Sequence, residues 1–200
     1  MNSIKLHLGA FDCSVDGWVN TDVTPHIWIS KIPLAPLLLF KLKIMPKFRY
    51  DQHLAGVFRQ LKYLDLCKKL PFQENSIDAI FSSHVFEHLF MDEVNKLIVE
   101  CFRVLKPGGV CRVVVPDLEK IISSYSAEDP TRFILDIYEV ASRSAVKNSH
   151  HSAFTGSSLT KLFAGAGFSK CMVVQYLVGI CPDIYKLDNR PDSLFFEAIK

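Results

Sequence analysis

The sequence lacks the features that mark several large protein classes. It contains no run of about 18 apolar residues, so no transmembrane helix is predicted. No long apolar core lies in residues 1–8, so no signal peptide is predicted. The motif G-x-G-x-x-G is absent, which argues against an enzyme that binds a nicotinamide dinucleotide. The net charge of +2 is too small to indicate a nucleic-acid partner.

The six cysteines show none of the paired C-x-x-C spacing that zinc sites and redox motifs use. Several of them fall inside segments with strand or helix patterns, where a thiol behaves as a small buried hydrophobic group. Reduced thiols are typical of a reducing compartment. The sequence therefore predicts a cytoplasmic protein with free thiols at Cys13, Cys67, Cys101, Cys111, Cys171 and Cys181.

The 200 residues, of which 49% are hydrophobic, suit one domain with a full core. Short apolar segments and longer helical patterns follow one another, as in α/β proteins. Strands are predicted at residues 4–8, 18–23, 61–66, 77–81, 110–115, 170–178 and 194–199. Helices are predicted at residues 13–16, 51–60, 92–105, 118–125, 130–143 and 155–166. Asp92 is the predicted N-cap of the third helix, and Ser157 or Ser158 that of the last.

Polar side chains gather where the strand at residues 77–81 ends. In an open α/β sheet, ligands bind beyond the carboxyl ends of the strands, so this cluster predicts a site. Gly9 follows the first strand, and a glycine there lets a ligand approach the backbone closely. The polar cluster consists of Ser82, Ser83, His84, Glu87 and His88.

Two motifs follow one another in the middle of the chain. The first comprises Asp65, Leu70-Pro71-Phe72, Ser76-Ile77-Asp78 and Glu87-His88. The second, R-V-L-K-P-G-G at residues 103–109, begins about fifteen residues later. Together they resemble the class I S-adenosylmethionine-dependent methyltransferases, in particular the type 11 family. Finding both motifs in order makes the resemblance specific.

The resemblance implies a three-layer α/β/α Rossmann-like sandwich. Its seven-stranded sheet would be mostly parallel, with an antiparallel last strand inserted into it. The implied cofactor is S-adenosylmethionine. Asp22 would meet both ribose hydroxyls, Asp65 the adenine amino group, and the Leu66 backbone N–H a ring nitrogen, while Asp117 and Glu119 would line the acceptor pocket. The predicted cofactor-binding residues are Gly9, Ala10, Asp22, Asp65, Leu66, Ser83 and His84.

Methyl transfer from S-adenosylmethionine is the leading functional hypothesis. The sequence does not identify the acceptor, and a small molecule, sugar or lipid is favoured over a nucleic acid. The rival hypothesis is a non-catalytic binding or scaffold protein that keeps the fold. Its support is the loop Gly9-Ala10-Phe11, where the family has a second glycine and this chain has a phenylalanine.

Three histidines, His84, His88 and His151, are the candidate catalytic residues. A general base is needed only when the acceptor must lose a proton, and a neutral histidine takes a proton near pH 7. The alternative is that His84 only shapes the cofactor pocket and that His88 packs under the next helix. The pair His150-His151 has no cysteine or carboxylate at a fitting spacing, so no metal site is predicted.

Residues 24–60 form a basic, apolar insert within a single domain of residues 1–200. No acidic residue lies between Val23 and Asp51, and prolines interrupt the segment repeatedly. Three interpretations fit: a lid over the substrate, a membrane-surface patch through residues 31–49, or a helix packed on the sheet with its lysines pointing outward. An oligomer contact fits the same exposed apolar pattern, and the oligomeric state is not predicted.

Overall fold

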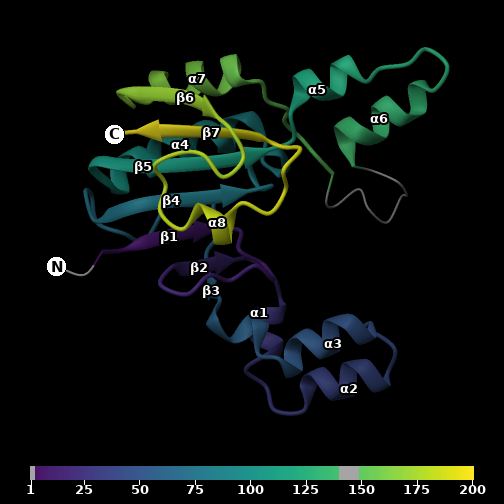
Figure 1. Cartoon of the computed structure of the whole chain (residues 1–200). Coiled ribbons are helices and arrows are strands. Elements are labelled where there is room, and N and C mark those ends of the chain that lie inside the picture. Colours follow the sequence, from purple (N-terminus) through teal and green to yellow (C-terminus); the bar gives the residue numbers. More distant parts are fainter. Residues whose placement is uncertain (1–2, 140–148) are drawn as a thin grey trace.

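One seven-stranded β-sheet organises the chain in the computed structural model, which describes residues 3–139 and 149–200 (Figure 1). The strands are β1 (Lys5–Leu8), β2 (Val19–Asp22), β3 (Lys62–Tyr63), β4 (Ile77–Ser83), β5 (Leu105–Val115), β6 (Lys170–Val174) and β7 (Leu194–Ile199). Their order is β3-β2-β1-β4-β5-β7-β6. The first five pair in parallel, and β7 runs antiparallel between β5 and β6. The mostly parallel sheet with an inserted antiparallel last strand is thereby confirmed.

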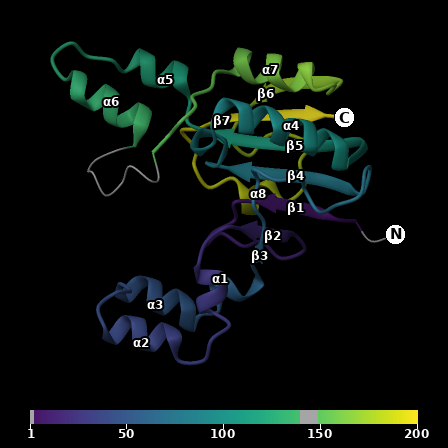
Figure 2. The ribbon, with the colours of Figure 1, turned by 180° about the vertical axis from the view of Figure 1, so that it is seen from behind.

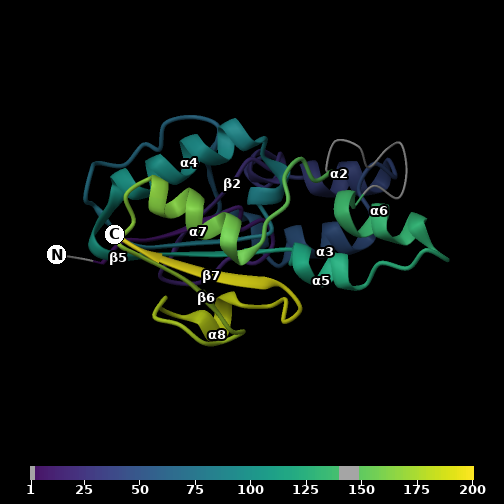
Figure 3. The ribbon, with the colours of Figure 1, turned by 90° about the horizontal axis from the view of Figure 1, so that it is seen from above.

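Helices lie on both faces of this sheet, as the view along its edge shows (Figure 3). The α-helices are α1 (His26–Ile29), α2 (Ala35–Lys41), α3 (Lys47–Leu54), α4 (Met91–Val104), α5 (Leu118–Ser123), α6 (Pro130–Tyr138), α7 (Gly156–Gly165) and α8 (Ile184–Leu187). Two 3₁₀ turns are η1 (Val57–Gln60) and η2 (Phe86–His88). α4 and α7 cover one face and α8 the other, which confirms the three layers. None of the described helices has the length and apolar character to span a bilayer.

The larger core lies between the sheet and the layer of α4 and α7. One side of α4 is fully buried, and the rings of Phe86, Phe163 and Phe196 pack in the same cluster. Each fully buried aliphatic or phenyl side chain contributes about 1.5–3 kcal/mol to folding. The buried side of α4 consists of Val94, Leu97, Ile98, Cys101 and Val104.

The opposite face of the sheet is covered differently. Among the described residues, no helix lies between β1 and β2, so the short helix predicted at residues 13–16 is wrong. Tight turns replace it, and the Asn20 side chain holds them by hydrogen bonds with the backbone N–H and C=O of Val15, both at 3.0 Å. The connection between β6 and β7, residues 175–193 with α8, covers this face instead (Figure 3).

A buried ion cluster fastens that connection to the sheet. Arg112 of β5 is fully buried and donates to both carboxylate oxygens of Asp188, which follows α8. It also donates to Glu197 of β7 at 2.8 Å and to the Val178 carbonyl at 3.0 Å. The two carboxylates accept further bonds from the backbone N–H groups of Leu177, Ile180 and Cys181. Such complete pairing is what a buried charge requires.

Several predicted element boundaries need correction. The third strand contains only Lys62–Tyr63, because the chain turns toward the site before Asp65. The predicted helix at residues 51–60 is divided into α3 and η1 by Gly56, which has φ = +76°. Thr155 rather than a serine caps α7 and accepts from the Ser158 N–H. Asp92 lies inside the first turn of α4, after the N-cap position at Phe90. Residues 140–143 of the predicted sixth helix lie outside the described residues.

The basic insert forms a helical lobe beyond the β3 edge of the sheet (Figures 1 and 2). α2 and α3 pack against each other, with the rings of Phe40 and Tyr50 stacked at 4.8 Å. The interpretation as a helix packed on the sheet is therefore wrong for α2, which buries no residue. The lobe meets the loop after β1 through Arg49, whose guanidinium lies 3.2 Å from Asp12 and 4.5 Å from the Phe11 ring centroid.

Replacing Arg112 by leucine should lower the free energy of unfolding by about 3–5 kcal/mol, because Asp188 and Glu197 would remain buried without their cation. Urea unfolding measures this change. Lys96→Met is the control: it removes a solvent-exposed ion pair with Asp92 and should leave the unfolding midpoint unchanged. Equal stability of the Arg112→Leu and wild-type proteins would contradict the proposed role of the cluster.

Candidate functional site

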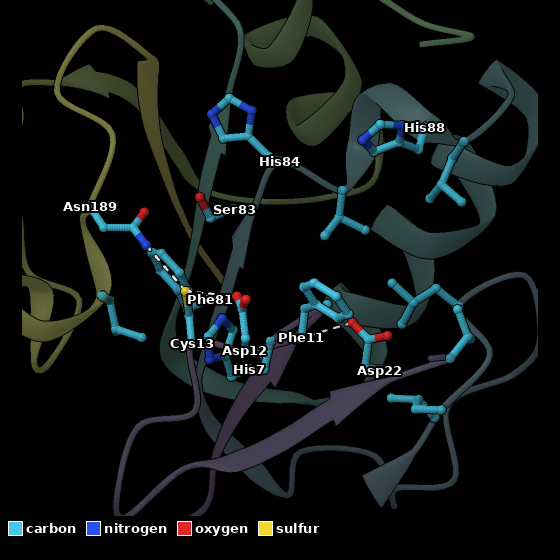
Figure 4. Close-up of a pocket in the computed structure, with 18 of the residues that line it drawn as sticks. His7, Phe11, Asp12, Cys13, Asp22, Phe81, Ser83, His84, His88 and Asn189 are labelled. Carbon is cyan, nitrogen blue, oxygen red and sulfur yellow. Dashed lines mark hydrogen bonds between the residues drawn. The ribbon is translucent and has the colours of Figure 1, made fainter. Parts of the chain in front are cut away.

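A cavity of about 560 Å³ opens at the carboxyl ends of β1, β2 and β4 (Figure 4). This size lies in the range of small-molecule and cofactor sites. All seven predicted cofactor-binding residues line it, although they come from four separate segments: Gly9, Ala10, Asp22, Asp65, Leu66, Ser83 and His84. The structure therefore brings the predicted set together in one place; what each residue binds stays a prediction.

The loop after β1 approaches the exit of β4 very closely. A Cβ atom added at Gly9, which has φ = +66°, would lie 2.2 Å from Val85 Cγ2, so no larger residue fits there without a shift. Phe11 occupies the position of the missing second glycine and still adopts the left-handed backbone of φ = +42°. Its ring packs toward the lobe, against Phe58 and under the Arg49 guanidinium. The loop thus keeps a glycine-like shape at this position.

Asp22 at the end of β2 holds this loop. One carboxylate oxygen accepts the Phe11 N–H at 3.1 Å, and the other accepts the Thr24 N–H at 2.7 Å. Burial raises the pKa of Asp22, and these backbone hydrogen bonds oppose that shift. Each oxygen keeps a second lone pair, so the carboxylate has capacity for two further donors from a ligand.

Asp65 and Leu66 form the wall beyond β3, together with the apolar side chain of Leu64. Asp65 accepts the Cys67 N–H at 3.0 Å and pairs with Lys68 at 3.1 Å. The hydrogen bond from Lys68 holds the pKa of Asp65 below its usual range, so the group is ionised near neutral pH.

The three candidate catalytic histidines take different places. His84 follows β4 with φ = +52°, and its ring contacts Ser193 Oγ through Nε2 at 2.9 Å and Glu87 Oε1 through Nδ1 at 3.0 Å. His88 also lines the cavity, and Figure 4 shows both rings at its rim. His151 does not line it; its ring is exposed and stacks on Phe90 at 4.3 Å.

A second hollow, of about 630 Å³ and more open, lies on the other side of His84. Asp117 lines it and also caps α5, accepting from the Glu119 and Lys120 N–H groups. Glu119, expected beside Asp117, does not line it. Charges of both signs surround the hollow, from Lys120, Arg132, Asp136, Glu139, Arg190 and Asp192.

Several residues that line the site could not be predicted from sequence patterns. His7 occupies an ordinary strand position, yet it is buried and lines the cavity beside Phe81. Asn189 and Arg190 reach the cavity from the β6–β7 connection, and they follow the end of β4 by more than a hundred residues. The structure also brings Glu87 and His88 next to His150, a grouping that their separation in sequence conceals.

Comparison with known proteins relates the chain to methyltransferases. Residues 45–113 match a family profile described as a methyltransferase domain. A probable S-adenosylmethionine-dependent methyltransferase of Mycolicibacterium smegmatis is 30% identical over 132 residues, 65% of this chain. The chain is similar to the class I S-adenosylmethionine-dependent methyltransferases, and its residues 45–113 are similar to the type 11 family. It spans less than half the length of the curated relatives that it matches, 42% of the one named here.

Solved structures of methyltransferases share the fold. A SAM-dependent methyltransferase from Archaeoglobus fulgidus superposes with a TM-score of 0.59 at 14% identity, over 99% of this chain and 86% of the other. The Haemonchus contortus phosphoethanolamine N-methyltransferase 2, in complex with S-adenosyl-L-methionine, gives 0.52 at 15% identity, over 100% and 49%. The matched relatives and the shared fold support S-adenosylmethionine as the cofactor.

The cavity suits that cofactor chemically. Asp22 offers acceptors for a vicinal diol, and Asp65 offers an acceptor for an exocyclic amino group. Leu64, Leu66 and Leu89 supply the apolar walls that an aromatic base needs. Gly9 has no side chain, and a Cβ atom added there would lie 2.2 Å from Val85 Cγ2.

His7 makes the stability of the protein pH-dependent. Burial lowers the pKa of His7 from 6.5 to about 4. Between these two pH values His7 is protonated in the unfolded chain and neutral in the folded chain. The free energy of unfolding should therefore fall as the pH drops from 6.5 toward 4, by about 3 kcal/mol for this group.

Replacing His7 by glutamine should make the free energy of unfolding depend less on pH between pH 6.5 and about 4. Urea unfolding at several pH values measures this dependence. Part of the slope should remain, because burial also lowers the pKa of His53 to about 4. The control, His151→Gln, alters an exposed ring and should keep the full slope. A His7→Gln profile parallel to that of the wild-type protein would contradict the assignment.

Proposed function

We propose that the protein transfers the methyl group of S-adenosylmethionine to a small polar acceptor. The observation that carries the proposal is the convergence of Gly9, Asp22, Asp65 and Ser83 on one cavity at the carboxyl edge of the sheet. Topology dictates that edge as the binding side of an open α/β sheet. The comparisons support an enzyme of this class and do not favour the non-catalytic scaffold.

Asp22 binds the two ribose hydroxyls with its remaining lone pairs, while its backbone contacts keep it in place. Asp65 accepts from the adenine amino group, and the Leu66 N–H donates to the ring. S-adenosylmethionine supplies an already activated methyl group, so the chain needs mainly to align the acceptor with it. Alignment of this kind lowers a barrier by about 7–11 kcal/mol.

For an acceptor that must lose a proton, His84 is the proposed general base. It lines both the cofactor cavity and the neighbouring hollow, and a hydrogen-bond contact between Nε2 and Ser193 Oγ orients its ring. His88 lies at the same rim. His151 lies outside the cavity lining, so its proposed catalytic role has no support from the geometry.

The hollow beyond His84 is the proposed acceptor pocket. Its lining of mixed charge suits a polar small molecule, a sugar or a lipid headgroup better than a nucleic acid, for which a contiguous basic surface would be expected. Free cysteines throughout the chain support a reducing cytoplasm as the compartment.

Replacing Asp22 by asparagine should weaken binding of S-adenosylhomocysteine by about 10- to 150-fold, because a hydrogen bond to a charged group contributes about 1.5–3 kcal/mol. Calorimetry measures the affinity, and a thermal melt confirms that the variant is folded. Asp16→Asn, an exposed carboxylate of the same loop outside the cavity, is the matched control.

Two results would contradict the proposal. Unchanged affinity in a folded Asp22→Asn protein would remove Asp22 from the cofactor site. The absence of any S-adenosylhomocysteine binding by the wild-type protein would favour the scaffold hypothesis.

We further propose that the helical lobe contacts an anionic membrane surface. A row of apolar side chains on the lobe is more than half exposed, and lysines flank it without any acidic residue between Val23 and Asp51. Exposed apolar side chains with flanking lysines are typical of segments that lie in a bilayer interface. The apolar side chains are Trp28, Ile32, Leu34, Leu38, Leu42, Ile44 and Phe48, and the lysines are Lys31, Lys41, Lys43 and Lys47.

Co-sedimentation with phosphatidylserine vesicles tests this contact. The wild-type protein should sediment with them, less so at high salt, and the double variant Leu38→Ser/Leu42→Ser should remain in the supernatant. Val99→Ser is the control, because Val99 is equally exposed on α4, away from the lobe. Equal sedimentation of the double variant and the wild-type protein would contradict the proposal. The interpretation of the lobe as a lid stays a prediction.

A further inference from the structure

Glu87 is a buried carboxylate without a hydrogen bond. Its side chain is 1% exposed, and neither carboxylate oxygen has a hydrogen-bond partner among the described residues. His84 Nδ1 lies at ion-pair distance from one oxygen, but the contact lacks hydrogen-bond geometry. Burying a carboxylate costs several kcal/mol unless a cation or donors compensate it. The position therefore demands a positively charged partner.

Two histidines lie beside Glu87, and a backbone carbonyl contacts Nδ1 of each ring. His150 Nδ1 lies 2.7 Å from the Ile137 carbonyl, and His88 Nδ1 lies 3.3 Å from the Ser149 carbonyl. A carbonyl only accepts, so each ring donates a proton from Nδ1, and Nε2 is the nitrogen with the lone pair when the ring is neutral. Hydrogen bonds of this kind to a backbone carbonyl orient metal-binding histidines. His150 Nε2 is buried and has no hydrogen-bond partner among the described residues.

The three groups are close enough to share one ion. One ligand atom from each of Glu87, His88 and His150 lies within 4.8 Å of the others. Ligands at about 2.0–2.2 Å from a metal in tetrahedral geometry would lie about 3.4 Å apart, so the three groups would have to move closer around a bound ion. A small cavity of about 10 Å³ borders Glu87 and His150, although His88 does not line it.

The backbone fixes this arrangement. The His151 and Ser152 N–H groups both donate to the Glu87 carbonyl, at 2.7 and 3.1 Å, and Ser152 Oγ donates to the Leu89 carbonyl. The His150 N–H donates to the Tyr138 carbonyl at the end of α6. The cluster therefore joins η2, the segment from residue 149 and the end of α6 before any ion binds.

We propose that Glu87, His88 and His150 form a binding site for one divalent transition-metal ion. Two imidazoles and one carboxylate are a donor set that zinc and non-haem iron use with coordination positions left open. The proposal departs from the sequence-based expectation of no metal, because the carboxylate that completes the set comes from a distant segment.

The place of the site suggests its use. His88 lines the cofactor cavity, and Pro116 and Ile121 border both the small cavity and the proposed acceptor pocket. An open coordination position there would hold an oxygen of the acceptor, as a Lewis acid does. This role rests on the proposed methyl transfer, whereas the metal site itself does not.

Titration of the untagged, chelator-treated protein with Co²⁺ tests the site through the visible absorption of the bound ion. The wild-type protein should bind one ion per chain. Glu87→Gln, His88→Ala and His150→Ala should each weaken binding by at least about 100-fold, since even changes behind the ligands cost 10- to 100-fold. His151→Ala removes the neighbouring histidine outside the cluster and should bind Co²⁺ as the wild-type protein does.

Thermal melts show whether each variant is folded. Without metal, Glu87→Gln should melt no lower than the wild-type protein, because it removes an uncompensated buried charge. With Zn²⁺, the wild-type and His151→Ala proteins should gain stability and Glu87→Gln should not. Failure of the wild-type protein to bind Co²⁺, or equal binding by all three ligand variants, would overturn the proposal.

Calorimetry with S-adenosylhomocysteine on the same metal-free protein separates this inference from the proposed function. Cofactor binding without any metal binding would refute the metal site alone. Metal binding without cofactor binding would refute the proposed function alone and leave the metal site standing.

Discussion

The buried charges of Arg112, Asp188 and Glu197 are the interaction on which the rest of the structure depends. The chain places no described helix between β1 and β2, so one face of the sheet needs another cover. The β6–β7 connection covers it with an apolar cluster that includes Cys181 and Leu187, and the ion cluster fastens the connection to the sheet. The same connection brings Asn189 and Arg190 to the cofactor cavity, so the cluster positions part of the site as well as part of the core.

The loop after β1 still lines the cavity although its sequence departs from the family motif. A phenylalanine at the second glycine position adopts a left-handed backbone, and contacts with Phe58 and Arg49 direct its ring toward the lobe. Asp22 then fixes the Phe11 N–H. The lobe therefore contributes to the shape of the cofactor loop, which links the proposed membrane contact to the site physically.

Much of the fold could be predicted from the sequence. Apolar periodicity placed seven strands, and the motifs around Leu70-Pro71-Phe72 and residues 103–109 indicated their order through the family. Local patterns could not show the two-residue length of β3 or the lobe that leaves the sheet, because both depend on tertiary packing. The candidate cofactor residues were predictable because strand ends meet at one edge. His7, Arg190 and the grouping of Glu87 with His150 were not, since burial and contacts between distant segments create them.

A crystal structure of the protein grown with S-adenosylhomocysteine tests the central claim most directly. The account predicts density in the cavity between Gly9 and Leu66, with the ribose hydroxyls at the Asp22 carboxylate and the adenine beside Asp65. The sulfur should face the rim formed by Ser83 and His84. Density bound elsewhere, or a cavity filled by the Phe11 ring at saturating ligand, would contradict the account.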